Sequence, residues 1–487
     1  MHWIGRSSGP LLLAFAATFL IAQVLVRPAV GIANNGDFPK MAGPFGLGPE
    51  DRDWNSHKQY GEFVYRYVRA DRYIYNRGFK TAEFWSSEFF FVKLARGLQR
   101  IFQPGPRFDI RWLGGVYSAF LLMALGVWFF AFAPRFRLLP GLLAVLICTD
   151  VAYVQYLNSF YMDTPAIVFL ILATAAGLHV AYRPDDWVFP PVMVLATLLF
   201  ATSKSQHAVS ALVLGLLFIG FACLSRNRTL RRAWIASSVV VVVMAVGMVR
   251  HDSPDYQSTG VFNIVFLRIA PEAPDPLQAL RELGLGKNEM RYLRTHAYFP
   301  DSPMADPAWA RAFALRCNHI TLIRYYLHHP SVPIRLLYEG LSTHAADMRP
   351  WGNLSLDDGF KPDAQSTAFS YWSDFRGFLL RRAPWHMILL VLTVLGTAIW
   401  LLVRSPRDRA CAGLTLAILV IAVLEYGVAE LVDAAETQRH VMISNLAMDL
   451  SILLLLVLVS RVWIWHRNRR LAGNGPAVSV TSDAACV

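Results

Sequence analysis

The sequence predicts an all-α polytopic membrane protein with about ten transmembrane helices. Three observations lead to this fold class. First, 55% of the 487 residues are hydrophobic and only 16% are charged. Second, the hydrophobic residues form long continuous blocks instead of the short periodic runs of a soluble core. Third, the basic residues gather in alternate gaps between these blocks, as is typical of cytoplasmic helix ends.

The predicted spans follow from block length, since a helix needs about 20 mostly apolar residues to cross a bilayer. The first block has no small-residue cleavage motif close behind it, so we expect a retained helix and not a cleaved signal peptide. The blocks that reach or nearly reach the required length are residues 10–32, 112–134, 138–157, 164–182, 187–202, 208–224, 233–249, 385–403, 410–432 and 441–465.

The basic residues predict the orientation, because Lys and Arg beside a span are retained in the cytoplasm. With ten spans, all six basic groups fall on one side of the membrane, which places both termini in the cytoplasm of a cell inner or plasma membrane. The net charge of +12 is then mainly an orientation signal, with membrane lipids as partners and no nucleic acid expected. The six groups are Arg6, Arg135 with Arg137, and those within 182–186, 226–232, 404–409 and 466–470.

The same topology divides the chain into six parts and puts two large segments on the outer side. The parts are a first transmembrane helix (1–32), a first outer loop (33–111), transmembrane helices two to seven (112–249), an outer helical domain (250–384), transmembrane helices eight to ten (385–465) and a disordered cytoplasmic tail (466–487).

Both outer segments carry helix signals. In the first, an amphipathic helix opens at Ser86 or Ser87, with Phe90, Leu94, Leu98 and Ile101 on one face, and is expected to lie along the membrane surface. The second is expected to be mostly helical without a large sheet. There, Asp275 can cap a helix that Gly284 stops.

Six sequence strings occur in an order that resembles a known family. They are "NNGDF" (34–38), "YLNSFYMDTPA" (156–166), "SKSQHA" (203–208), "FNIVF" (262–266) followed by "DPLQALRELGL", and "QRHVMISNLAMDL" (438–450). Together with the long first outer loop and the late outer domain, they resemble the GT-C superfamily of membrane glycosyltransferases. More narrowly, they are similar to bacterial hexosyltransferases of cell-surface glycan biosynthesis.

The resemblance implies an enzyme that uses a polyprenyl-phosphate-linked sugar. It would transfer a hexose to a hydroxyl of a surface glycan or lipid-linked acceptor on the outer face, with inversion at the anomeric carbon. Such a reaction needs a base near the acceptor oxygen and positive groups at the leaving phosphate.

Asp37 is the candidate for the base. It follows the first apolar block directly, behind a flexible Asn34-Asn35-Gly36 segment that lets the backbone approach a ligand closely. A helix-end turn, in which Asp and Asn satisfy loose backbone groups, is the alternative. The resemblance favours the catalytic role.

Asp163 is the second candidate catalytic acid, because it stands in the outer turn between the third and fourth spans. The Asp-Thr-Pro sequence is equally a good helix start, and both interpretations stay open. The family pattern often has glutamate here, which leaves the role of the shorter side chain undecided. Asp150, at the outer end of the third span, is a further candidate, although a buried structural carboxylate would explain it as well.

Two outer turns supply basic residues for the donor phosphate. The first holds Lys204 with Gln206 and His207, and the second holds Arg439 and His440. A lysine at an outer turn runs against the positive-inside tendency, which makes Lys204 informative. The alternatives are snorkelling to the interface and, for Arg439, an ion pair with Glu436.

Polar neighbours of the two acids are the candidates for binding the acceptor or the sugar: Asn34, Asn35, Asn158 and Tyr161. No cofactor is required by the sequence. A divalent metal could be held between Asp37 and Asp163 through oxygen ligands.

Two other classes of protein also fit the pattern. A transporter or lipid-linked sugar flippase would explain the spans and the basic residues, although no internal repeat is visible. A non-catalytic envelope assembly protein would explain the outer helical domain.

Overall fold

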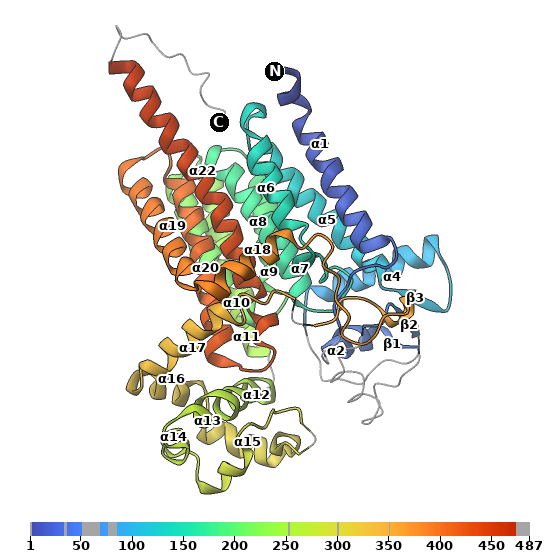
Figure 1. Cartoon of the computed structure of the whole chain (residues 1–487). Coiled ribbons are helices and arrows are strands. Elements are labelled where there is room, and N and C mark those ends of the chain that lie inside the picture. The colour runs from blue at the N-terminus through green and yellow to red at the C-terminus, as the bar shows by residue number, and fades with distance from the viewer. Residues whose placement is uncertain are drawn as a thin grey trace.

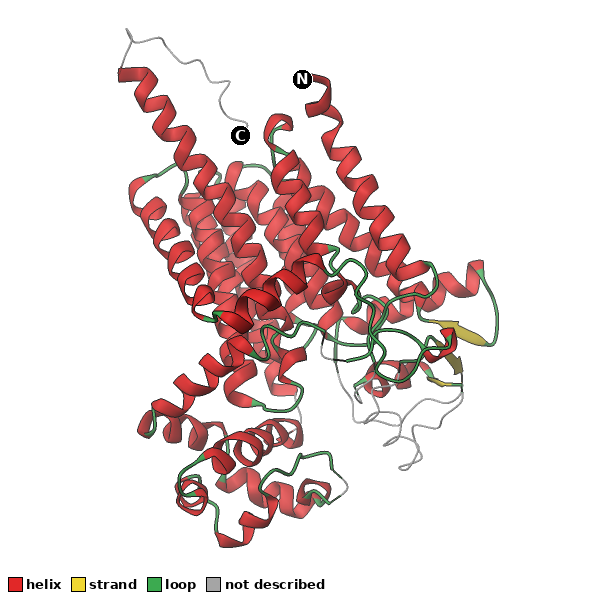
Figure 2. Cartoon of the chain, viewed as in Figure 1, coloured by secondary structure: helices red, strands yellow, loops and turns green. Residues whose placement is uncertain are grey.

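The computed structural model describes residues 2–33, 37–50, 69–75, 85–251, 254–299, 301–349 and 351–473. Over these residues the chain is a bundle of long helices with two smaller parts at one end, and almost all regular structure is helical (Figures 1 and 2). The predicted all-α polytopic fold is confirmed. The predicted residues Asn34 and Asn35 lie outside the described residues.

Ten apolar helices occupy the ten predicted spans. In the part of the chain that the structure describes, eight are long and apolar enough to cross a membrane, and α6 and α9 are shorter. The long ones are α1 (His2–Leu20), α5 (Arg111–Phe130), α8 (Asp163–Tyr182), α10 (Ser205–Leu224), α11 (Arg228–His251), α19 (Trp385–Arg404), α20 (Arg409–Val432) and α22 (Met442–Gly473), and the short ones are α6 (Leu138–Cys148) and α9 (Phe189–Ala201).

Two of these helices end earlier than their apolar blocks. The α1 helix passes into a π-helical turn, η1 (Ile21–Leu25), and helical structure stops before Pro28, which lacks a backbone donor. After α6 the chain turns at Thr149, and α7 (Val151–Val154) begins a new helix capped by Asp150. The α22 helix, in contrast, extends to Gly473, past the predicted start of the tail.

The first outer loop contains a small sheet, which the sequence patterns did not predict. Strands β1 (Leu47–Pro49), β2 (Arg72–Tyr75) and β3 (Arg107–Asp109) pair antiparallel in the order β1-β2-β3, with Tyr73 opposite Pro49 and Phe108. The other elements of this loop are α2 (Phe38–Ala42), the 3-10 turn η2 (Gly43–Phe45) and α4 (Glu88–Phe102).

The α4 helix is the predicted amphipathic helix, but it packs on the protein through a different face. Its buried residues are Glu88, Phe91, Val92, Ala95 and Gln99. Phe90 and Ile101, from the predicted apolar stripe, are exposed. Leu94 and Leu98, the other two residues of that stripe, are half-buried against the core. The placement of α4 along a membrane surface stays a prediction.

The second outer segment is helical, as predicted, with its own small core of buried side chains that include Phe262, Phe313 and Leu336. Asp275 accepts hydrogen bonds from the backbone N–H groups of Leu277 and Gln278, and Gly284 ends that turn with a φ of 77°. The helices are α12 (Pro254–Ile264), α13 (Ala270–Glu272), α14 (Pro276–Glu282), α15 (Pro307–Arg316), α16 (His319–His328), α17 (Ser331–Ser342) and α18 (Tyr371–Arg382), with η4 (Val265–Ile269), η5 (Lys287–Tyr292), η6 (Pro303–Ala305) and η7 (Leu356–Asp358) between them.

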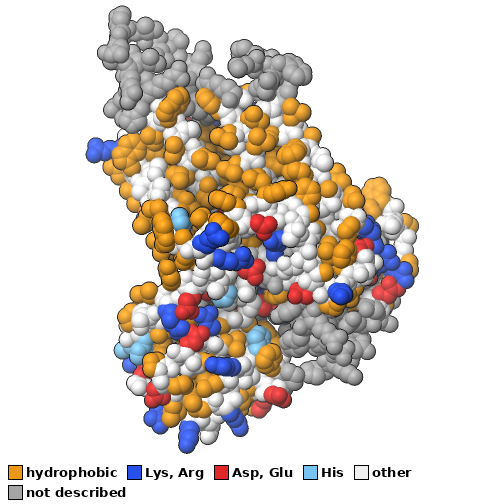
Figure 3. Space-filling model, viewed as in Figure 1, with side chains coloured by type: hydrophobic (Ala, Val, Ile, Leu, Met, Phe, Trp, Pro, Cys, Tyr) orange, Lys and Arg blue, Asp and Glu red, His pale blue; other side chains and the backbone are white. Residues whose placement is uncertain are grey.

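Both outer segments lie at the same end of the bundle, which we call the lobe end, and the described chain begins and ends at the opposite end (Figure 1). The surface of the bundle is mainly hydrophobic, whereas charged side chains gather at the lobe end (Figure 3). This arrangement agrees with an even number of crossings. Which side of the membrane each end faces stays a prediction.

The α8 helix is the centre of the bundle, since 94% of its span is buried by the surrounding helices. A helix that is apolar on all sides is typical of such a central position. Because α8 begins at Asp163, this carboxylate is fixed at the lobe end of the most enclosed helix.

A buried polar network connects α18 of the outer helical domain with α7 and α22. Asp449 of α22 accepts hydrogen bonds from Tyr153 (2.6 Å) and Trp372 (2.7 Å), and it pairs with Arg376 of α18 at 3.2 Å. Asp150 caps α7 and also accepts from the N–H groups of Trp372 and Ser373. Of the two interpretations of Asp150, these contacts favour the structural one.

Candidate functional site

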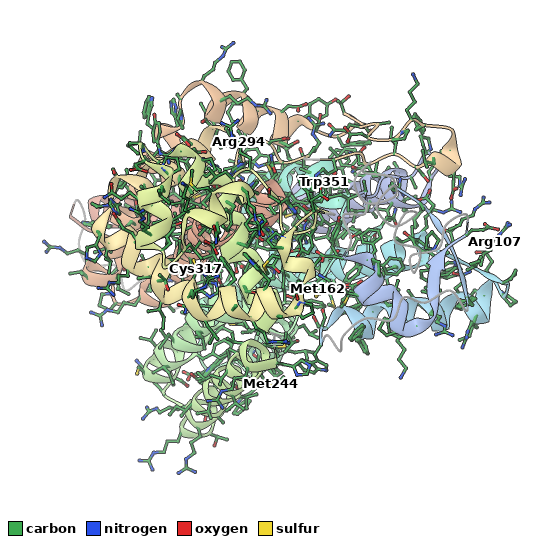
Figure 4. All side chains as sticks on the ribbon, turned by 90° about the horizontal axis from the view of Figure 1, so that it is seen from below. Arg107, Met162, Met244, Arg294, Cys317 and Trp351 are labelled. Atoms are coloured by element: carbon green, nitrogen blue, oxygen red, sulfur yellow. The ribbon has the colours of Figure 1, made fainter. Side chains whose placement is uncertain are left out.

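Four segments that are far apart in the sequence place charged side chains together at the lobe end. Asp37 precedes α2, Asp163 opens α8, Lys204 precedes α10, and Arg439 lies in α21 (Thr437–His440). In Figure 4, which looks onto the lobe end, Met162 beside Asp163 lies between Cys317 of the outer helical domain and Arg107 of the sheet. We call these four residues with Glu436 the charged cluster.

Arg439 is the centre of the charged cluster. One guanidinium nitrogen, Nη1, pairs with Asp163 at 2.9 Å, and the other, Nη2, pairs with Asp37 at 2.8 Å and with Glu436 at 3.1 Å. The guanidinium carbon lies 4.8 Å from the ring centre of Tyr161. Arg439 is 3% exposed, so one buried cation joins three carboxylates from three separate segments.

Lys204 is held more loosely than Arg439. Its ammonium nitrogen lies 3.5 Å from Asp163 Oδ1 and 3.3 Å from His440 Nδ1. Its backbone is extended, with a φ of −157°, and its side chain makes no capping hydrogen bond to α10. Because both contacts are long, they are weak, and the free energy needed to replace them by hydrogen bonds to a strong acceptor such as phosphate is small.

His207 and Gln206 are fixed by an acid that sequence reasoning missed. Glu425, buried within α20, accepts from Gln206 Nε2 at 2.9 Å and contacts His207 Nδ1 at 3.0 Å. The other nitrogen of His207 lies 3.3 Å from Asp163. His207 therefore orients Asp163, and Glu425 orients His207. The predicted phosphate-binding roles of Gln206, His207 and His440 stay predictions.

The predicted sugar-binding residues Asn158 and Tyr161 both hold the chain that follows α1. Asn158 donates to the carbonyls of Val24 (2.9 Å) and Val30 (2.7 Å), and the Tyr161 hydroxyl donates to Ala33 at 2.8 Å. Tyr161 also lies under Arg439, whereas the Asn158 side chain is directed to the backbone. Their roles toward a sugar stay predictions.

For Asp37, both the catalytic role and the alternative of a helix-end turn stay predictions. Asp37 stands at the N-cap of α2 without a capping hydrogen bond. Its two oxygens pair with Lys40 at 2.7 Å and with Arg439 at 2.8 Å. Burial alone would raise the pKa of Asp37, but the charges of Lys40, Arg439 and Lys204 hold that pKa well below its usual value.

Glu436 differs from Asp37 in its backbone conformation and in the direction in which its pKa is shifted. It has a left-handed backbone, with φ 57° and ψ 31°, which costs a residue with a side chain about 1–3 kcal/mol. Burial raises the pKa of Glu436 to about 7, although Arg439 opposes this rise. Sequence reasoning noted Glu436 only as an ion-pair partner of Arg439. No pattern in the sequence predicts that a glutamate adopts a left-handed backbone conformation.

No group of three or more metal-binding side chains occurs among the residues that the structure describes. Between Asp37 and Asp163 the structure places the Arg439 guanidinium, which neutralises both carboxylates. A metal held by these two acids stays a prediction.

Comparison with curated protein sequences gives no match. Two solved structures resemble the fold weakly. The oligosaccharyltransferase AglB from Archaeoglobus fulgidus, in complex with an inhibitory peptide and a dolichol-phosphate, is 11% identical with a TM-score of 0.39, and 99% of this chain aligns to 54% of that one. The apo form of the Archaeoglobus fulgidus oligosaccharyltransferase is 10% identical with a TM-score of 0.41, and 100% of this chain aligns to 55% of that one.

This chain thus spans about half the length of the two solved proteins. A comparison with protein families gives a match over almost the whole chain, residues 2–475. The chain belongs to the family of the YfdI N-terminal transmembrane domain.

Proposed function

We propose that this protein is a membrane glycosyltransferase of the GT-C type that transfers a hexose from a polyprenyl-phosphate donor to a hydroxyl of a surface glycan or lipid-linked acceptor. The observation that carries this proposal is the charged cluster, in which cations and carboxylates from four segments meet at the ends of membrane helices. The order of sequence strings that resembles GT-C hexosyltransferases supports it.

The charged cluster has the parts that such a transfer needs. The acceptor oxygen attacks the anomeric carbon while the bond from that carbon to the phosphate oxygen breaks, so the phosphate gains charge and the acceptor loses a proton. Lys204 and Arg439 would stabilise the leaving phosphate. A carboxylate would take the proton, and the sequence assigns this role to Asp37.

The position of the cluster also suits a lipid-borne donor. A polyprenyl chain stays in the bilayer, and its phosphate lies at the level of the helix ends. Lys204 is the best-placed cation to meet that phosphate, because its contacts with Asp163 and His440 are long. The transfer would take place at the lobe end, with inversion at the anomeric carbon. A divalent metal is no part of this scheme.

Replacing Lys204 by methionine tests the proposal. We expect the affinity for a polyprenyl-phospho-hexose to fall about tenfold or more, because methionine keeps the length of the side chain and removes the charge. The measurement is donor binding and release of polyprenyl phosphate by the purified protein in lipid nanodiscs, with a panel of hexoses.

The matched control is Lys287→Met, at an exposed lysine of η5 in the outer helical domain. This control should bind and turn over the donor like the wild type. If Lys204→Met does so as well, the proposed phosphate site is wrong. If the wild type neither binds nor turns over any donor of the panel, the proposed function is wrong.

A further inference from the structure

Two carboxylates of the charged cluster, Asp37 and Asp163, are poor proton acceptors, although the sequence predicted both as catalytic. Each oxygen of Asp37 is engaged by a cation, Lys40 on one side and Arg439 on the other. Asp163 is 1% exposed and is surrounded by Lys204, His207 and Arg439. A carboxylate that is held in its charged form by two or three cations has little tendency to accept a proton.

Glu436 is the most accessible acid of the charged cluster. Its side chain is 23% exposed, compared with 13% for Asp37 and 2% for Asp163. Its contact with Arg439, at 3.1 Å, is also the longest of the three that Arg439 makes to carboxylates. Of the three carboxylates around Arg439, Glu436 is therefore the one most open to solvent.

The backbone of Glu436 is a second, independent observation. A left-handed conformation is easy for glycine and strained for glutamate. Strain of this kind persists when the surroundings hold it, and it concentrates at functional sites. The Glu436 side chain contacts Arg439 at 3.1 Å, where the leaving phosphate of the proposed reaction would lie.

We propose that Glu436, and not Asp37, accepts the proton of the acceptor hydroxyl, an inference that rests on the proposed glycosyl transfer. The hydroxyl oxygen forms its bond to the anomeric carbon as its proton passes to the Glu436 carboxylate. The bond from the anomeric carbon to the phosphate oxygen breaks, and its electron pair stays on the phosphate. Glu436 then returns the proton to water. Asp37 acts as a positioning residue that holds Arg439.

The groups around Glu436 give this proposal a distinct pH signature. Arg439, Asp37 and Asp433 are its charged neighbours, and Tyr156 and Tyr161 face it from the turn before α8. With the pKa of Glu436 raised to about 7, the base is protonated below that pH. The rate of transfer should therefore rise as the pH increases through about 7. If Asp37 were the base, its lowered pKa would leave the rate flat through this range.

The test measures the pH profile of kcat for transfer from a polyprenyl-phospho-hexose by the purified full chain in nanodiscs. Glu436→Gln should lose about 10²- to 10⁴-fold in kcat, the usual contribution of a general base. Glu436→Asp should retain activity, and the increase of its kcat with pH should occur at lower pH than in the wild type. Sodium formate should partly rescue Glu436→Ala. Glu282→Gln, an exposed glutamate of α14, is the matched control and should behave like the wild type.

Glu436→Gly separates catalysis from stability. Glycine relieves the left-handed backbone, so this variant should unfold at the wild-type Tm or above it while transfer is lost. A large drop in Tm together with the loss of activity would assign Glu436 a structural role and overturn the proposal.

The outcomes distinguish failure of the proposed role of Glu436 from failure of the proposed glycosyl transfer. A wild-type enzyme with a flat profile through pH 7, or a Glu436→Gln variant with wild-type kcat, overturns the role of Glu436 and leaves the proposed function standing. A wild type that transfers no sugar from any donor, while the folded protein is intact, overturns the proposed function and this inference with it.

Discussion

Arg439→Met is expected to abolish sugar transfer and also to destabilise the protein. Methionine cannot pair with Asp37, Asp163 or Glu436, so three carboxylates are left close together without their shared cation. Breaking one buried ion pair typically costs about 3–5 kcal/mol. Transfer should fall about 10³-fold, because Arg439 is also one of the two cations that we propose to stabilise the leaving phosphate.

Arg439→Lys refines this experiment, since lysine keeps the charge but presents one point of contact instead of a planar fork. We expect it to recover part of the lost Tm and little of the activity. The measurements are Tm in detergent and kcat in nanodiscs, with Arg311→Met, an exposed arginine of α15, as the control. An Arg439→Met variant that keeps a tenth or more of the wild-type kcat would contradict the proposed role of Arg439 in the transfer.

Asp163→Asn is expected to lower kcat/KM for the donor about 10²-fold while the fold is kept. The variant decides between the two interpretations of Asp163 that the sequence leaves open. Asparagine starts a helix about as well as aspartate, so a helix-start role would survive the change. The negative charge that orders Lys204, His207 and Arg439 would not survive it.

The readout for Asp163→Asn is steady-state transfer together with donor binding. A donor affinity that falls with kcat/KM would point to misplaced cations, as the geometry predicts. Wild-type kinetics in Asp163→Asn would mean that Asp163 only begins α8 and has no role in the transfer. Asp275→Asn, at the start of α14 in the outer helical domain, is a control for helix capping away from the site.

The bundle could be predicted from the sequence because each span is a local property. An apolar block of about 20 residues must either cross a membrane or be buried in the protein interior, and this holds for any sequence around it. The same holds for the cap at Asp275 and the stop at Gly284, which depend on neighbouring residues. The small sheet was missed, since its three strands are three or four residues long and distant in sequence.

The charged cluster could be predicted only in part. Asp37, Asp163, Lys204 and Arg439 stand beside helix ends, where a charge is noticeable in an apolar sequence. Glu425 lies inside a span and is 218 positions from His207, so no local pattern joins the two. The contacts of Asn158 with the backbone carbonyls of Val24 and Val30 could not be predicted either, because these residues are 134 and 128 positions away in the sequence.

The most direct measurement of the central claim follows a labelled polyprenyl-phospho-hexose in sealed proteoliposomes that contain the purified protein and a glycan or lipid acceptor. Our account predicts that the sugar leaves the donor, that polyprenyl phosphate accumulates, and that the new glycosidic bond has the inverted configuration. A donor that moves intact between the two leaflets and keeps its sugar would contradict the account and identify a flippase instead.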